Sequence, residues 1–180
     1  MSAPSFTLLP ETRDDWWEVE ALFDLCFAPG REALSSYRLR DGTAPLADLG
    51  RVARDRDGIL AGALRFWPVR VAGREALLLG PIAVHPTRQG EGLGGLLMRE
   101  GLGAARAGGW SRVLLVGDAP YYGRFGFARL PQVEMPPPTN PDRVLGIALV
   151  PGAWDGVAGP VTRADGGGDA AATGGKGGGV

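Results

Sequence analysis

Residues 83–101 read AVHPTRQGEGLGGLLMREG, and five of these residues are glycines. The first N–H groups of a helix have no partner inside it, and the helix dipole adds partial positive charge there. Glycines let the backbone approach a ligand closely and adopt positive φ. A tight turn alone explains the stretch poorly, because so many glycines cost backbone entropy. The stretch therefore predicts a phosphate- or pyrophosphate-binding loop that opens a helix.

A strand is predicted before this loop and a helix after it. Residues 76–84 (ALLLGPIAV) are almost continuously apolar, which is typical of a buried strand. Proline cannot donate to a sheet ladder, so we expect this strand to bulge or lose pairing near Pro81 and to leave backbone groups free. Residues 93–107 have helical periodicity, and 112–116 (RVLLV) form the next predicted strand. The expected buried stripe of the helix is Leu93, Leu96, Leu97, Gly101 and Ala104.

The N-terminal part of the chain predicts a strand, helices and a hairpin. Residues 6–9 are apolar, and Thr12 with Asp15 resembles a capping box at a helix start. Residues 32–39 favour a second, weaker helix. Residues 49–71 predict two strands joined at an Asp-Gly turn, and 72–75 a further turn. The buried stripe expected in the first helix is Trp16, Val19, Phe23 and Cys26, with Cys26 as a small core residue.

The C-terminal part alternates turns with short strands. Residues 117–127 predict a turn and a short helix, followed by a strand near Ala128. Residues 131–142 are too rich in proline for regular structure, whereas 144–150 and 157–162 favour strands. Residues 166–180 have too little apolar area to offset their ordering entropy and predict a flexible tail. The sequence thus predicts a mixed α/β sheet.

Two phosphate-binding patterns fit the glycines. Gly90, Gly92 and Gly95 satisfy G-x-G-x-x-G, the dinucleotide fingerprint, and Asp118 follows at a distance suited to a ribose-binding acid. In the dinucleotide fold, however, the glycines follow the strand almost at once, whereas here residues 85–89 intervene. No second nucleotide-binding half follows either, so a nicotinamide- or flavin-dependent oxidoreductase is the weaker hypothesis.

The second pattern is Q-x-x-G-x-G, formed by Gln89, Gly92 and Gly94. Together with GPIAV before it and YYGRFGF after it, this pattern resembles the GCN5-related N-acetyltransferases (GNAT), which bind acetyl-CoA. The resemblance runs through residues 77–130, about a third of the chain. It is strongest to a subgroup of predicted small acetyltransferases that carry both flanking segments.

This resemblance implies a fold, a co-substrate and a site. It implies a central, mostly antiparallel sheet with splayed strands flanked by helices, in a domain over residues 1–165. Acetyl-CoA would be the co-substrate, its pantetheine would lie along Ile82, Ala83 and Val84, and the Val84 N–H would stabilise the oxyanion of acetyl transfer. Tyr122 would act as general acid toward the departing thiolate. The residues implied for the pyrophosphate are Arg88, Gln89, Gly90, Glu91, Gly92, Leu93, Gly94 and Gly95.

No general base is singled out by spacing. His85 is the only histidine and is one candidate for the base, and Arg124 is expected to be solvated. The acceptor is expected to be the amine of a small molecule or peptide, and the alternative function is a non-catalytic acyl-CoA sensor. Other acidic candidates for the base are Glu32, Glu75, Asp118 and Glu134. Side chains that can shape the acceptor side are Trp16, Trp17, Phe27, Trp67 and the 131–142 loop.

Composition narrows the partners and the location. The formal charge of −1 over 180 residues gives no basic field for nucleic acid or a membrane surface. A single cysteine allows no intramolecular disulfide and no cysteine cluster for a metal. Neither a signal peptide nor a membrane span is recognised, so a soluble cytoplasmic protein is expected, as a monomer or homodimer.

Overall fold

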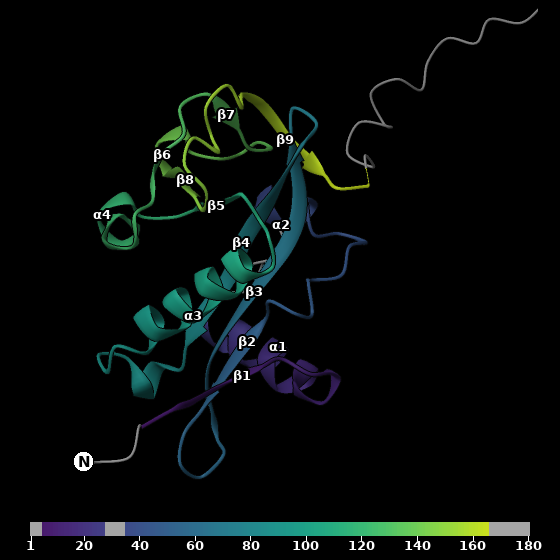
Figure 1. Cartoon of the computed structure of the whole chain (residues 1–180). Helices are drawn as coiled ribbons and strands as arrows, with labels where there is room; N and C mark the ends of the chain where they lie inside the picture. Colours follow the sequence, from purple (N-terminus) through teal and green to yellow (C-terminus); the bar gives the residue numbers. More distant parts are fainter. Residues whose placement is uncertain (1–4, 28–34, 166–180) are drawn as a thin grey trace, which may run out of the picture.

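The computed structural model describes residues 5–27 and 35–165, and its strands form a mixed sheet between helices (Figure 1). The main path of the sheet runs β1-β2-β3-β4-β5-β8-β6, while β9 pairs with β3 and β7. This is the mixed, helix-flanked sheet that the sequence predicts. The expected tail at 166–180 lies outside the described residues. The strands are β1 Thr7–Pro10, β2 Arg51–Arg54, β3 Leu60–Val71, β4 Arg74–Val84, β5 Arg112–Val116, β6 Ala128–Arg129, β7 Val133–Glu134, β8 Val144–Ala148 and β9 Gly159–Arg163.

Helix α1 (Trp16–Cys26) begins at the predicted capping box, after a 3₁₀ turn at Arg13–Asp15. The Asp15 carboxylate accepts from the Thr12 N–H over 2.7 Å. Val19 and Phe23 are fully buried, as the stripe predicts, whereas Trp16 and Cys26 are half-buried. Helix α2 (Ser35–Arg38) covers part of the predicted second helix, and its expected first residues lie outside the described ranges.

Two antiparallel hairpins join β2, β3 and β4, as predicted. The first turns at Gly58, where φ is +80°. The Asp55 carboxylate accepts from the N–H of Asp57 at 2.9 Å and of Ile59 at 3.0 Å, which closes this turn. The second hairpin turns at residues 72–73, so β3 and β4 are the longest paired strands of the sheet.

The predicted irregularity near Pro81 is present. The register of β3 and β4 shifts between the pairs Phe66–Leu79 and Leu64–Ile82, so Gly80 and Pro81 together lie opposite a single residue of β3. Such a bulge bends the strand and disturbs its pairing.

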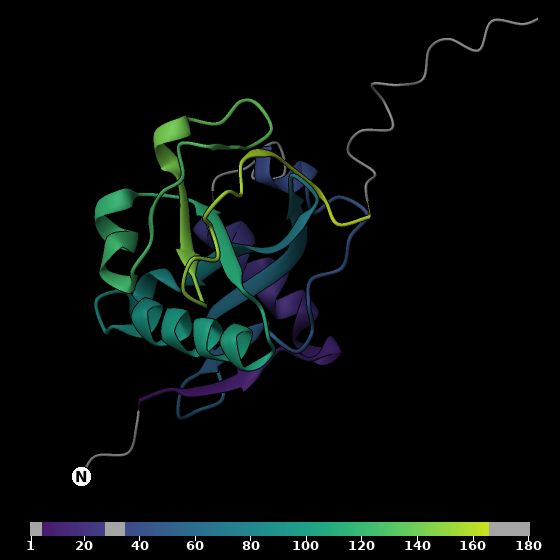
Figure 2. The same cartoon turned by 45° about the horizontal axis from the view of Figure 1, so that its top comes forward.

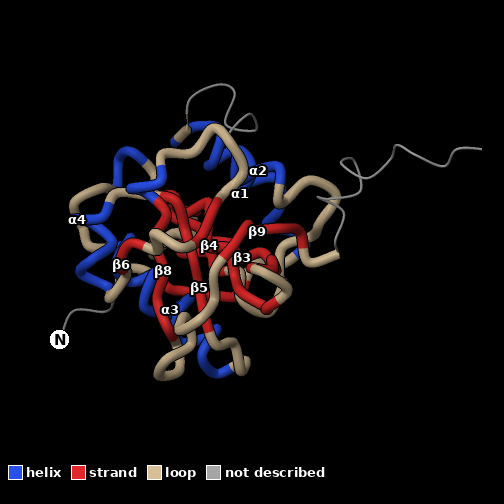
Figure 3. The backbone as a smooth tube through the Cα atoms, turned by 90° about the horizontal axis from the view of Figure 1, so that it is seen from above, coloured by secondary structure: helices blue, strands red, loops and turns tan. Residues whose placement is uncertain are grey.

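The helices cover opposite faces of the sheet. Helix α3 (Leu93–Ala107) packs on one face, where Leu97 and Met98 lie in a core with Leu64 and Phe66 of β3. Helices α1 and α2 lie on the other face, so that Figure 3 shows the sheet between the two helical layers. The stripe predicted for α3 is wrong at Leu96, which is 44% exposed. Its buried residues are Leu93, Leu97, Met98, Gly101, Leu102 and Ala105, whereas Ala104 is half-buried.

The C-terminal segment packs beside β5 (Figure 2). Helix α4 (Ala119–Tyr122) continues into a 3₁₀ turn at Gly123–Phe125, followed by β6, as predicted. The predicted loop at 131–142 is correct except for β7, which pairs in parallel with β9, and for a 3₁₀ turn at Pro141–Arg143. Among the described residues, the only parallel pairing in the main path joins β4 to β5. A doubly wound dinucleotide-binding sheet needs several parallel strands, so this topology excludes that alternative.

Candidate functional site

The candidate site lies where β4 and β5 separate. These strands pair at only two positions, the last of which joins Leu78 to Leu114. β4 continues to Val84 and β5 to Val116. Beyond Leu78, β4 therefore has a free edge on its β5 side within the part of the chain that the structure describes.

Backbone groups of Ile82 and Val84 face this gap. The N–H of His85 donates to the carbonyl of Ala61 in β3 over 2.8 Å, which fixes the phase of the ladder. Successive residues of a strand direct their polar backbone groups to opposite edges. Ala83 therefore faces β3, as His85 does, and the polar groups of Ile82 and Val84 face away from β3. The family resemblance implies that pantetheine lies along Ile82, Ala83 and Val84. The polar backbone groups of Ala83 point to β3 instead of into the gap.

The Val84 carbonyl already has polar neighbours. The Cys26 thiol donates to it at 3.4 Å, and the Gln89 side-chain amide lies at 3.5 Å. Burial raises the pKa of the Cys26 thiol, which favours the protonated form. Cys26 is thus a donor that fixes the end of β4, consistent with the predicted structural role and not with a nucleophile.

The loop after β4 has the backbone geometry expected of an anion site. Gly90 and Gly92 have φ of +87° and +78°, a region that favours glycine. The first hydrogen bond of α3 runs from the N–H of Leu96 to the carbonyl of Gly92 over 3.2 Å. The N–H groups of residues 93–95 precede it and have no partner within the helix.

A groove of about 540 Å³ lies over this loop. A Cβ atom on Gly94 would lie 3.0 Å from the Tyr121 hydroxyl, and one on Gly95 would lie 3.3 Å from the Arg99 guanidinium. Side chains at these two positions would fill the groove, so glycine keeps the backbone accessible. No carboxylate is among its described lining residues, which are Val84, Arg88, Gln89, Gly90, Gly92, Leu93, Gly94, Gly95, Arg99, Tyr121, Arg124 and Phe125.

Arg88 reaches the groove but is paired with carboxylates. Its guanidinium contacts Glu91 at 2.8 Å and Asp55 at 2.9 Å, and lies over the Phe6 ring at 4.7 Å. Glu91, also implied by the resemblance, therefore faces Arg88. Arg99 reaches the same groove from α3. The sequence did not single it out, because helical spacing alone does not show which side chains of α3 border this groove.

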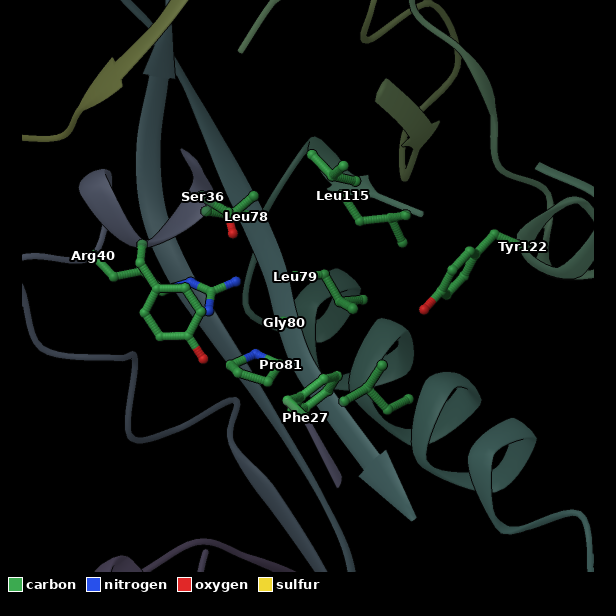
Figure 4. A pocket seen from close by; sticks show the side chains of 12 residues that line it. Phe27, Ser36, Arg40, Leu78, Leu79, Gly80, Pro81, Leu115 and Tyr122 are labelled. Carbon is green, nitrogen blue, oxygen red and sulfur yellow. The ribbon is translucent and has the colours of Figure 1, made fainter. Parts of the chain in front are cut away.

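Tyr122 lies at the gap itself. Its ring borders a cavity of about 140 Å³ between β4, β5 and α2, and Figure 4 shows its hydroxyl pointing into this cavity. Burial raises the pKa of the Tyr122 hydroxyl, with a further contribution from neighbouring Tyr121. The described lining residues are Phe27, Ser36, Tyr37, Arg40, Leu78, Leu79, Gly80, Pro81, Ile82, Leu115, Val116 and Tyr122.

The adjacent residues Tyr121 and Tyr122 line different cavities. Their rings make an edge-to-face contact at 4.9 Å, and Tyr121 borders the loop groove instead of the gap. A Cβ atom on Gly117, directly after β5, would overlap the Tyr122 ring. Gly117 thereby allows the ring to lie against the end of β5, a positioning role that the sequence did not indicate.

The base candidates named from the sequence lie away from these cavities. His85 accepts from the Thr87 N–H at 3.2 Å through Nδ1, so its ring is fixed beside its own loop. Glu75 lies at the opposite end of β4, paired with Arg70. Asp118 and Glu134 are exposed, and Glu32 lies outside the described residues. The two described cavities are lined by none of the four described candidates.

A second, polar groove of about 500 Å³ meets the Tyr122 cavity, because Tyr37, Arg40 and Pro81 line both. Of the side chains named from the sequence for the acceptor side, Trp16 and Trp67 line this groove, whereas Trp17 is 80% exposed. The 131–142 loop lines neither space.

The Arg65 guanidinium is buried beneath this polar groove. It contacts Glu11 at 2.8 Å and Glu20 at 2.5 Å and lies over the Trp16 ring at 4.0 Å. Two carboxylates therefore compensate its charge, which is what a buried cation requires.

Neither a metal cluster nor a membrane span is found among residues 5–27 and 35–165. No group of three or more histidine, cysteine, aspartate or glutamate side chains is arranged to hold a metal ion. None of the described helices has the length and apolar character needed to cross a bilayer.

Known proteins match both the sequence and this geometry. Residues 10–130 match the model of the acetyltransferase (GNAT) domain family. The protein named uncharacterized N-acetyltransferase YhbS from Escherichia coli strain K12 is 35% identical over 111 residues, which are 61% of this chain and 65% of YhbS. The match thus spans less than two thirds of that relative.

Solved structures agree over a longer stretch. The crystal structure of YhbS from Escherichia coli in complex with CoA has a TM-score of 0.78 and 30% identity, covering 92% of this chain and 93% of YhbS. A GNAT acetyltransferase from Brucella melitensis in complex with acetyl-CoA has a TM-score of 0.66 and 30% identity, covering 88% of this chain and 95% of that one.

Proposed function

The chain belongs to the GNAT family of acetyltransferases, and on this premise we propose that it transfers an acetyl group from acetyl-CoA directly to an amine. The proposal rests on one observation: the Tyr122 cavity and the groove over the glycine loop lie next to each other along the last residues of β4. Ile82 lines the Tyr122 cavity, and Val84, two residues further on, lines the glycine-loop groove. One elongated ligand with a diphosphate and a reactive end would span both.

The loop groove would hold the diphosphate of this carrier. The N–H groups of residues 93–95 would donate to its oxygens, aided by the positive end of the α3 dipole. The carbonyl of Ile82 and the N–H of Val84 would bind the pantetheine arm as a neighbouring strand does. Acetyl-CoA, when bound, supplies an activated acetyl group.

The lining of the cavities supports Ile82 as the N–H donor to the acetyl oxygen. Ile82 borders the same cavity as Tyr122, whereas Val84 borders the loop groove with Tyr121. We therefore replace the sequence-based choice of Val84 with Ile82. Such a donor stabilises the negative charge that develops on oxygen, and removing one typically slows turnover by about 100- to 1000-fold.

Tyr122 would supply the proton for the departing sulfur. A phenol has a pKa of about 10 and a thiol about 8.5, and burial raises the pKa of Tyr122 further. The hydroxyl is therefore protonated throughout the neutral range. Because it holds its proton more tightly than a thiol, it acts by sharing this proton as charge develops on sulfur.

The acceptor amine would approach from the polar groove that adjoins the Tyr122 cavity. It must arrive neutral, because an ammonium ion has no lone pair. The acceptor is the amine of a small molecule or peptide, consistent with a groove lined by both aromatic and charged side chains.

The test combines ligand binding with turnover. Thermal unfolding is measured with acetyl-CoA, CoA, NAD and FAD, and we expect stabilisation by the first two only. A panel of amines is then assayed for CoA release, with amino acids, polyamines and peptide N-termini represented. Stabilisation without release by any acceptor would favour a non-catalytic sensor, and stabilisation by NAD or FAD instead would contradict the proposal.

A further inference from the structure

Two arginines of the loop groove are arranged differently from Arg88. Arg99 projects from α3 and Arg124 follows α4, and both line the groove over the glycine loop. Arg88 is compensated by two carboxylates, as described above. Within the described residues, Arg99 and Arg124 form no ion pair with a carboxylate. The groove thus has two cationic side chains whose charge is available to a ligand.

Aromatic rings hold both guanidinium groups in place. Arg124 lies over the Tyr121 ring at 4.6 Å, and Arg99 lies near the Phe125 ring at 5.9 Å. The two rings contact each other edge to face at 5.7 Å. Cation–π contacts orient a guanidinium without neutralising it, and every N–H donor remains usable.

The glycine loop and the start of α3 can hold a diphosphate through backbone N–H groups, which leaves the two arginines for another anionic group of the ligand. The amides of residues 93–95 already offer several donors to a diphosphate. CoA carries one more anionic group, the phosphate on its 3′-ribose oxygen, which is absent from dephospho-CoA. Arginine binds such a phosphate well, because its planar fork matches two phosphate oxygens.

We propose that Arg99 and Arg124 bind the 3′-phosphate of CoA and make the protein selective for CoA over dephospho-CoA. This inference rests on the proposed function, because it assigns the remaining charges of the same groove. Arg88, which the sequence suggested for the phosphates, instead braces the loop against the β2–β3 turn through Asp55.

The test is calorimetric titration of CoA and dephospho-CoA into the wild-type protein, Arg99→Gln, Arg124→Gln and the double variant. We expect the wild type to bind CoA about 10- to 100-fold more tightly than dephospho-CoA, as one or two charged hydrogen bonds allow. The double variant should lose this factor for CoA, bind dephospho-CoA as the wild type does, and show a smaller salt dependence for CoA. Arg106→Gln is the matched control, because Arg106 is exposed on α3 two turns further along and outside the groove lining.

Each other outcome has a distinct meaning. Equal losses for both ligands would place the arginines on the diphosphate and overturn the proposal, as would unchanged affinities in the double variant. Equal affinity of the wild type for the two ligands would overturn it as well. If the wild type bound neither ligand, the proposed function itself would fail.

Discussion

Tyr122 shows how a side chain becomes suited to a reaction through its immediate neighbours. Gly117 leaves room for its ring, and Phe127 contacts that ring edge to face at 6.1 Å. These contacts hold the ring half-buried at the gap, with its hydroxyl directed into the cavity. Burial at this place therefore both raises the pKa of the Tyr122 hydroxyl and holds the hydroxyl beside β4.

Removing the Tyr122 hydroxyl should impair turnover while leaving binding intact. We expect Tyr122→Phe to lower kcat by about 100-fold, within the usual range for a lost general acid. Affinity for acetyl-CoA should be nearly unchanged, because the loop groove is untouched. Steady-state CoA release and calorimetry measure the two quantities on one preparation. Wild-type kcat in this variant would show that another group supplies the proton.

The raised pKa of Tyr122 also predicts a dependence of stability on alkaline pH. The folded-state pKa lies above the unfolded value of about 10, so the neutral hydroxyl's contribution is complete below pH 10. It is lost as pH rises through the folded pKa. The free energy of unfolding, measured in urea from pH 7 to 11, should therefore fall more steeply above pH 10 in the wild type than in Tyr122→Phe. Parallel curves for the two proteins would argue against burial of the ring.

Helix α3 approaches the sheet closely because a glycine on each side of the interface makes room for larger side chains of the other side. A Cβ atom on Gly101 would lie 2.5 Å from a methyl group of Leu64 and 2.9 Å from the Phe66 ring. A Cβ atom on Gly62 of β3 would lie 2.9 Å from Leu97. Because α3 begins at the glycine loop, this close packing also fixes where the loop amides point.

Two alanine substitutions in α3 should have opposite effects. Gly101→Ala should destabilise the fold by about 1–3 kcal/mol, because the core has no room for a methyl group. Gly103→Ala should stabilise it by about 0.5–1 kcal/mol, because Gly103 is exposed, with no atom within 4 Å of its Cβ position, and alanine favours a helix. Urea denaturation measures both. Equal effects of the two changes would contradict the close approach of α3.

The glycine loop can be tested with a control matched in strain. Gly92 and Gly73 have φ of +78° and +81°, and no atom lies within 4 Å of either Cβ position. Alanine at either site should therefore cost about 1 kcal/mol of stability through backbone strain. Only Gly92→Ala should also weaken binding of acetyl-CoA, since Gly73 turns the β3–β4 hairpin at the opposite end of β4 from the loop. A comparable loss of affinity in Gly73→Ala would show that strain alone, and not the loop, explains the effect.

The sequence predicted the elements of this fold well, because their signals are local. Asp57-Gly58 marks the hairpin, the Thr12–Asp15 box starts α1, and the α3 and β5 boundaries match the apolar periodicity. What the sequence missed depends on residues far apart in the chain. The Arg88–Asp55 pair joins two loops, and Arg99 borders the groove only because α3 lies beside α4.

The fold as a whole leaves one stretch of strand, the part of β4 after Leu78, unpaired on its β5 side within the described residues. The bulge opposite Arg65 and the early end of β4–β5 pairing expose that stretch, and helices on both faces hold the sheet around it. The spaces proposed for the diphosphate, acetyl transfer and the acceptor all adjoin this irregular strand. This arrangement explains why the catalytic proposal and the binding proposal both depend on the last residues of β4.

The most direct measurement is a crystal structure of the protein with CoA bound. It should place the diphosphate within hydrogen-bonding distance of the amides of residues 93–95. The pantetheine should lie along Ile82 and Val84, with the sulfur near the Tyr122 hydroxyl. Clear binding of CoA at another surface, with the gap between β4 and β5 closed by protein side chains, would contradict the account.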